Sequence, residues 1–189
     1  MDAVEFALAE IEAIKGIIAK IDPAQLEKFA GEITGAKHIF IGGTGRSLLF
    51  MKGFAMRLMQ TNHKTCLVGD ACTPSVRPGD LLIVASGRGT TAVTLELVRK
   101  AKLQGARTAV ITMNPDAPIP KECHCVVAVS KFSPPAKSDR PEMVFIKENL
   151  SGNLVEAAIV LITDGVVANI MKQNGITGET VAYNHANLE

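Results

Sequence analysis

The segment SGRGTT at residues 86–91 combines glycine, hydroxyl and arginine residues in a way that suits anion binding. It directly follows the apolar run 81–85 and precedes an amphipathic run. Glycines let backbone N–H groups approach a ligand closely, and a helix N-terminus adds partial positive charge. Three hydroxyls and a charged fork add further donors, more than a capped helix start requires. The predicted phosphate-binding residues of this segment are Ser86, Gly87, Arg88, Gly89, Thr90 and Thr91.

A second glycine-rich segment, IGGTGRS at residues 41–47, also lies between an apolar run and a helical pattern. Because the loops that follow parallel strands gather at one edge of a sheet, we expect Gly45, Arg46 and Ser47 to line the same pocket. For Ser47, capping of the following helix is an equally good interpretation.

The same segment could also begin a dinucleotide-binding motif. Gly43 and Gly45 have the required spacing, and Asp70 at the end of the next strand could bind a ribose. Leu48 occupies the position of the third glycine, so the motif is incomplete. A dinucleotide-binding oxidoreductase therefore remains an alternative, but it leaves residues 86–91 unexplained.

These loops need a scaffold, and the rest of the chain predicts one. Apolar runs that lack polar alternation are separated by helical patterns, which indicates a parallel sheet covered on both faces. We therefore predict an α/β fold with a doubly wound, five-stranded parallel sheet and helices on both faces. The predicted strands are residues 38–41, 64–68, 81–85, 108–111 and 126–129.

We expect a single domain over residues 1–189, made of four parts. A helical hairpin (1–35) precedes the sheet core (36–130), and a long apolar helix with a polar tail (150–189) ends the chain. Between them, residues 130–149 are polar, contain several prolines and lack a clear period, so we expect a lid or subunit arm. The long helix and residues 48–59 have little polar face, which favours burial in a subunit interface.

Composition excludes several classes of partner. The 189 residues carry a formal net charge of +1, with one Tyr and no Trp, so neither nucleic acid nor an acidic membrane surface is expected to bind. Glu156 and Asp164 interrupt the longest apolar region, which disfavours a membrane span. Acidic residues near the N-terminus disfavour a signal peptide. We expect a cytoplasmic protein.

Cys123, His124 and Cys125 could in principle bind a metal. On a strand, however, the two cysteines would share one face and the histidine would point to the other. The sequence offers no second cluster with zinc-like spacing. We therefore predict buried thiols, and neither a metal nor another cofactor.

The segments GTGRS, SGRGTT, FAMRLM (54–59) and HANLE (185–189) together resemble the sugar isomerase (SIS) domain. Within that family the likeness is greatest to the 6-phospho-3-hexuloisomerases, and it runs over nearly the whole chain. The resemblance implies a homotetramer that interconverts 3-hexulose 6-phosphate and fructose 6-phosphate without metal or nucleotide. It also implies that residues 86–91 bind the sugar phosphate.

The resemblance implies two catalytic residues. Glu156 on the long apolar helix is the expected base, because moving a carbonyl to the adjacent carbon requires proton transfer through an enediol. His185 in the tail is the expected proton shuttle at oxygen or ring-opening acid, reaching the site of a neighbouring subunit. Without the resemblance, His185 would be taken as a solvated residue.

Two substitutions leave the substrate open. The family loop usually has a second serine where Arg88 stands and a glutamate where Thr90 stands. A different aldose–ketose phosphosugar isomerase of the same fold is therefore an alternative. A protein that binds sugar phosphates without turnover is another.

Overall fold

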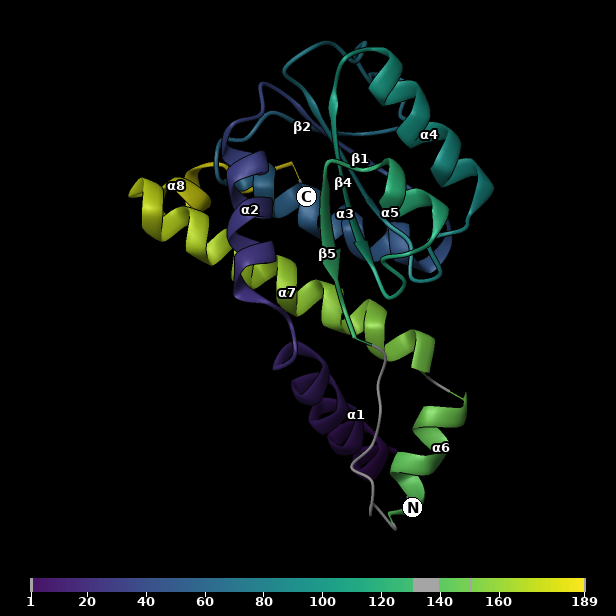
Figure 1. Ribbon diagram of the computed structural model, residues 1–189. Helices are drawn as coiled ribbons and strands as arrows, with labels where there is room; N and C mark the ends of the chain where they lie inside the picture. Colours follow the sequence, from purple (N-terminus) through teal and green to yellow (C-terminus); the bar gives the residue numbers. More distant parts are fainter. Residues whose placement is uncertain (1, 131–139, 150, 189) are drawn as a thin grey trace.

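The computed structural model describes residues 2–130, 140–149 and 151–188 (Figure 1). Helices and strands alternate through the middle of the chain, as the sequence predicts. In chain order the elements are α1 (Ala3–Ile18), α2 (Pro23–Thr34), β1 (Ile39–Gly42), α3 (Gly45–Gln60), β2 (Thr65–Leu67), β3 (Leu81–Ala85), α4 (Ala92–Leu103), β4 (Arg107–Thr112), α5 (Pro118–Glu122), β5 (Cys125–Ala128), α6 (Pro141–Asn149), α7 (Ser151–Asn174) and α8 (Gly178–Tyr183).

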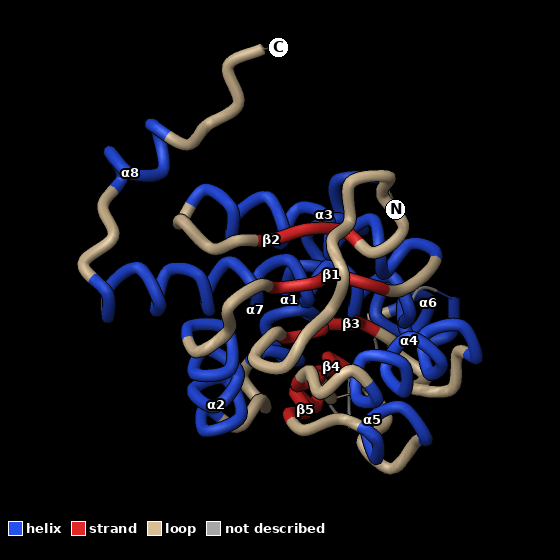
Figure 2. Tube along the Cα trace, turned by 90° about the horizontal axis from the view of Figure 1, so that it is seen from above, coloured by secondary structure: helices blue, strands red, loops and turns tan. Residues whose placement is uncertain are grey.

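The five strands form one parallel sheet in the order β2-β1-β3-β4-β5, and Figure 2 shows them side by side. Every predicted strand is present, within two residues of its expected ends, and the α/β fold class is confirmed. All residues of β1 and β3 are buried, which explains why these strands read as unbroken apolar runs. The strand order reverses between β1 and β3, and this is the point where ligands bind in such sheets.

Successive side chains of the strands enter two separate cores. Ile39, Ile41 and Ile83 pack in a core that also contains residues of α1, α2, α3 and α7. Phe40 and Leu82 point the other way, into a smaller core with α4 and α5. The sheet is therefore covered on both faces, with most of the helical mass on one of them.

Helix α7 is the central helix of the larger core. It packs against α1, α2 and α3, and its contact with α3 is the most extensive. By length and composition alone, Gly152–Asn174 could cross a membrane, but half of its most apolar window is buried inside the protein. This is the pattern of a core helix.

Helix α6 differs from the irregular stretch expected at residues 130–149. Pro141 begins the helix, and Met143 and Ile146 are buried one turn apart. Phe145 makes an edge contact with Phe6 of α1, with ring centroids 5.4 Å apart. The apolar residues of this helix are consecutive in the sequence and only two of them are buried, so they show no helical period. The predicted lid or arm partly concerns residues 131–139, which lie outside the described residues.

The two cysteines near β5 do not share a face, contrary to expectation. Cys125 is fully buried in the larger core, whereas Cys123 packs against the smaller one. The reason is that β5 begins only at Cys125, and Cys123 still caps α5. Burial raises the pKa of the Cys123 thiol to about 11, which favours the protonated form.

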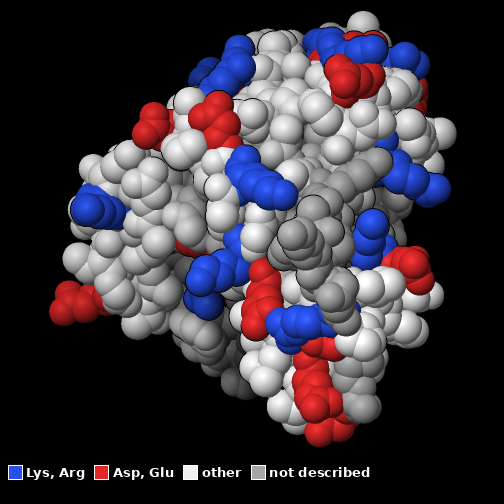
Figure 3. Space-filling model, turned by 60° about the horizontal axis from the view of Figure 1, so that its bottom comes forward, with Lys and Arg blue, Asp and Glu red and all other residues white. Residues whose placement is uncertain are grey.

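The surface carries both signs of charge. In Figure 3, Lys and Arg side chains alternate with Asp and Glu over the visible face and form no single large patch of one sign. This distribution fits the net charge of +1.

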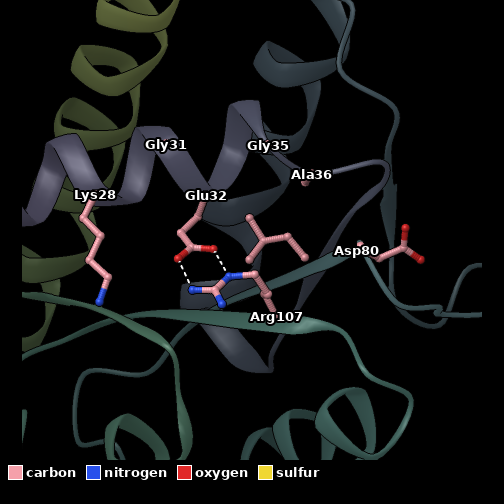
Figure 4. Close-up of a pocket in the computed structure, with 9 residues that line it drawn as sticks. Lys28, Gly31, Glu32, Gly35, Ala36, Asp80 and Arg107 are labelled. Atoms are coloured by element: carbon pink, nitrogen blue, oxygen red, sulfur yellow. Dashed lines mark hydrogen bonds and ion pairs between the residues drawn. The ribbon is translucent and has the colours of Figure 1, made fainter.

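The amino ends of the strands are held by an ion pair beside a cavity of about 340 Å³ (Figure 4). Both carboxylate oxygens of Glu32 on α2 accept hydrogen bonds from the guanidinium of Arg107 at the start of β4. Lys28 has a different partner, since its Nζ donates to the His124 carbonyl at 2.8 Å. The Arg107 hydrogen bonds hold the pKa of Glu32 below its usual value, so the ion pair fastens α2 to the sheet.

We predict that Glu32→Gln lowers the free energy of unfolding at pH 7 by about 1–3 kcal/mol, because a charged bidentate contact is lost. Since the pKa of Glu32 is lowered in the folded state, its stabilisation is present above the unfolded value of 4.5. It disappears as the pH falls through the lower, folded value. Urea unfolding of both proteins at pH 7 and in acid should show the difference shrinking.

The matched control is Glu96→Gln, which breaks an exposed pair with Lys100 at 3.7 Å. Exposed pairs contribute about 0.5 kcal/mol or less, so this variant should unfold almost as the wild type does. Equal losses in the two variants would contradict the assignment.

Candidate functional site

A cavity of about 420 Å³ lies at the carboxyl ends of β1 and β3, where the strand order reverses. Both glycine-rich loops and the start of α7 form its walls. Its lining residues are Thr44, Gly45, Arg46, Ser47, Ala85, Ser86, Gly87, Arg88, Thr91, Met113, Gly152, Val155, Glu156 and Ile159.

Two helix N-termini point their free amides toward this cavity. Helix α3 begins at Gly45 after the N-cap Thr44, and α4 begins at Ala92 after the N-cap Thr91. Within the described residues, neither N-cap side chain bonds to its helix. The first-turn N–H groups therefore remain available to an anion, and both helix dipoles favour one.

The loop after β3 is closed by its own hydrogen bonds. The Gly89 amide donates to Ser86 Oγ at 3.2 Å, and Ser86 Oγ lies 3.3 Å from Thr91 Oγ1. Ser86 is 5% exposed, so its hydroxyl belongs to the cavity floor. The loop presents a fixed set of donors rather than a mobile one.

The last residue of β4 and the residue that follows it support the same loop. Neither residue was identified from the sequence. The hydroxyl of Thr112 donates to the Ser86 carbonyl at 2.8 Å, and the Met113 amide donates to the Gly87 carbonyl at 3.0 Å. Thr112 is 1% exposed. A threonine ending an apolar strand was the available signal, because a buried hydroxyl must find an acceptor.

Two of the predicted phosphate-binding residues lie outside the cavity lining. Thr90 is exposed, and Gly89 is buried against the α5 region. Gly89 has φ +69°, and a Cβ at this position would lie 2.5 Å from the Cβ of Ala117. Glycine is therefore required here by the turn and by packing, and its amide is already used by Ser86.

Glu156 faces the cavity from α7 and contacts the first turn of α3. Arg46 Nε lies 2.5 Å from Glu156 Oε2, and Ser47 Oγ donates to Glu156 Oε1 at 3.1 Å. The Glu156 side chain is 17% exposed. Each carboxylate oxygen thus has one polar or charged partner and keeps a free lone pair.

Arg88 is the uncompensated cation of the cavity. Its side chain is exposed at the rim, and among the described residues it has no ion-pair partner. Arg46 and Arg88 against Glu156 leave the lining with one net positive charge. Together with the two helix N-termini, this favours an anionic ligand.

His185 does not reach the cavity of its own chain. The tail is attached at the other end of α3, where Asn184 Nδ2 donates to the Gln60 carbonyl at 3.0 Å. With a rise of 1.5 Å per residue, the two ends of this helix lie about 24 Å apart. His185 is exposed, and the chain beyond α8 runs away from the body of the molecule (Figure 2).

Asp70, which a dinucleotide-binding site would need, does not line this cavity. It is exposed in the turn after β2. The dinucleotide alternative thus loses its ribose ligand.

We predict that Gly89→Ala destabilises the protein by about 2–4 kcal/mol, from a left-handed backbone and a steric clash with Ala117. Binding of a phosphate ester should weaken as well, because the loop must shift. Denaturant unfolding and titration calorimetry measure the two effects.

Gly175→Ala is the matched control, since Gly175 has φ +66° but its Cβ would meet nothing within 4 Å. It should cost only about 1–2 kcal/mol and leave ligand binding unchanged. If the two variants lose equal stability, the packing role of Gly89 is wrong.

Comparison with known proteins identifies close relatives of this chain. The SIS domain model matches residues 32–135. The 3-hexulose-6-phosphate isomerase of Mycobacterium gastri is 35% identical over 90% of this chain and 83% of its own. The isomerase of the same name from Methylomonas aminofaciens is 36% identical over 86% of this chain and 87% of its own.

A solved structure agrees with these matches. The hypothetical protein MJ1247 from Methanococcus jannaschii, whose structure infers a function of 3-hexulose-6-phosphate isomerase, has a TM-score of 0.80 to this chain. The match covers 100% of both chains at 27% identity.

Proposed function

Since the chain belongs to the SIS domain family, we propose that it is a phosphosugar isomerase that interconverts 3-hexulose 6-phosphate and fructose 6-phosphate. The observation that supports this proposal is that one cavity contains Glu156, two helix N-termini without a side-chain cap, and Arg88. Among the described residues, Arg88 has no ion-pair partner. Relatives that carry the isomerase name align over most of the chain.

In this proposal the phosphate group binds at the start of α4. Ser86, Gly87 and Thr91 provide hydroxyl and amide donors, and Arg88 closes over the phosphate from the rim. The cavity's net positive charge balances part of the phosphate's negative charge. Binding energy gained at this end orients the reacting carbons at the other end.

Glu156 is the proposed base. It removes the proton from C2 of the 3-ketose, which gives an enediol between C2 and C3, and returns the proton to C3 as the carbonyl forms at C2. Arg46 and Ser47 hold the carboxylate in place for this step. Because one carbon of the substrate is oxidised while its neighbour is reduced, the proposed reaction needs no external oxidant or reductant.

The proton exchange between the two oxygens is assigned to His185 of a neighbouring subunit. His185 is exposed, and the tail is attached at the end of α3 that is far from the cavity of its own chain. In this proposal the tail therefore serves the cavity of another copy of the chain. Exposed apolar side chains on α3 and α7, such as Leu49, Met56 and Leu161, support assembly into the proposed homotetramer. We place this enzyme in the cytoplasm.

A second candidate is another aldose–ketose phosphosugar isomerase, because Arg88 and Thr90 replace the usual family residues. Incubation of the wild type in D₂O with a panel of sugar phosphates distinguishes the two. Deuterium entering C2 or C3 of 3-hexulose 6-phosphate or fructose 6-phosphate supports the proposal, and entry only into C1 or C2 of an aldose–ketose pair supports the alternative. Binding without any exchange would identify a sensor instead.

We predict that Glu156→Gln reduces kcat at least 100-fold, since the general base is removed while shape and hydrogen bonding to Ser47 are kept. Circular dichroism and thermal unfolding should match the wild type. A folded variant with wild-type turnover would rule out Glu156 as the base.

We predict that Arg88→Ala raises the KM of the phosphate ester about 10-fold or more, because it removes the one lining cation that has no ion-pair partner among the described residues.

Removal of residues 183–189 should have the opposite effect: kcat falls sharply, while the affinity for phosphate esters changes little. Steady-state kinetics and calorimetry separate the two. Full activity of the shortened chain would refute a role for His185.

A further inference from the structure

The guanidinium of Arg46 lies between two partners on different elements. On one side its Nε lies 2.5 Å from Glu156 Oε2. On the other, its Cζ lies 5.0 Å from the centre of the Phe50 ring. Phe50 is one turn further along α3, so the ring and the arginine share a face of this helix.

The position of Arg46 is electrostatically unfavourable for a cation. It is in the first turn of α3, where the helix dipole repels positive charge. Its side chain is also 53% exposed, so water and many rotamers compete with the contact to Glu156. Something must select the rotamer that reaches across to α7.

We propose that Phe50 is a positioning residue for Glu156 and acts through Arg46. The ring face attracts the guanidinium and restricts its rotamers, so that the Nε edge stays directed at the carboxylate. The Arg46 contact in turn fixes the orientation of Glu156 Oε2. This inference rests on the proposed role of Glu156 as base.

Few other charges could take over this role. The charged residues that line the cavity are Arg46 from α3, Arg88 from the loop after β3, and Glu156 itself from α7. Ser47 is the remaining polar partner of Glu156, and it is neutral. The orientation of the Glu156 carboxylate therefore depends mainly on whether Arg46 stays in place.

The direct test is Phe50→Leu, which keeps an apolar side chain but removes the ring. A partly exposed cation–π contact favours the paired state about two- to fivefold, so kcat should fall by about that factor while KM stays unchanged. Phe50→Tyr keeps a ring face and should restore kcat.

Leu103→Ala is the control, because Leu103 is the last residue of α4, is 82% exposed and does not line the cavity. Its kcat and KM should equal those of the wild type. Thermal unfolding of all variants identifies any general loss of folding. If Phe50→Leu behaves as Leu103→Ala does, the proposal is wrong.

A double-mutant cycle tests whether Phe50 acts through Arg46. Once Arg46→Met has removed the guanidinium, adding Phe50→Leu should change kcat no further. The same two- to fivefold loss in both backgrounds would show that Phe50 acts independently of Arg46, which overturns the proposal.

An independent measurement separates this inference from the proposed function. The Nε–H signal of Arg46, assigned by its absence in Arg46→Met, can be observed by NMR without any substrate. Its exchange with water should be faster in Glu156→Gln and also in Phe50→Leu, because each variant loses one of the two contacts that hold the guanidinium. Unchanged exchange in Phe50→Leu refutes the positioning role even in an active isomerase, whereas a wild type without isomerase activity refutes only the function.

Discussion

The reversal of strand order between β1 and β3 is the constraint on which the rest of the site depends. Helix α3 leaves β1 toward the larger core, and α4 leaves β3 toward the smaller one. Their N-termini begin close together and then diverge, so a crevice must open between the two loops. Every donor in the cavity, whether amide or hydroxyl, takes its position from this one topological feature.

Packing of α7 along α3 adds the acidic group to this crevice. Glu156 is 109 residues from Ser47 in the chain, yet their side chains are hydrogen bonded. The two arginines of the cavity have different surroundings. Arg46 is paired with the carboxylate, whereas Arg88 has no ion-pair partner among the described residues. The cavity therefore keeps one arginine that the protein's own carboxylate does not occupy.

The sheet could be predicted from the sequence because strands buried on both faces are unbroken apolar runs between helical patterns. The convergence of the two glycine-rich loops followed from the same parallel topology. Contacts between distant elements could not be predicted. The pairing of Arg46 with Glu156 depends on how two helices pack, and the need for glycine at residue 89 depends on Ala117 of a later loop. Helix α6 was missed because only two of its residues are buried. Cys123 and Cys125 face different cores because β5 begins at Cys125, which leaves Cys123 outside the strand.

The ion pair of Glu32 with Arg107 lies at the amino ends of the strands, and the cavity lies at their carboxyl ends. The contact that holds α2 to the sheet and the proposed binding cavity thus lie at opposite edges of one sheet. Substitutions in the exposed parts of the loops, such as an arginine at residue 88, change the ligand environment without disturbing the contacts that hold α2 to β4. A scaffold divided in this way can acquire new substrates through its loops while its resistance to unfolding stays nearly constant.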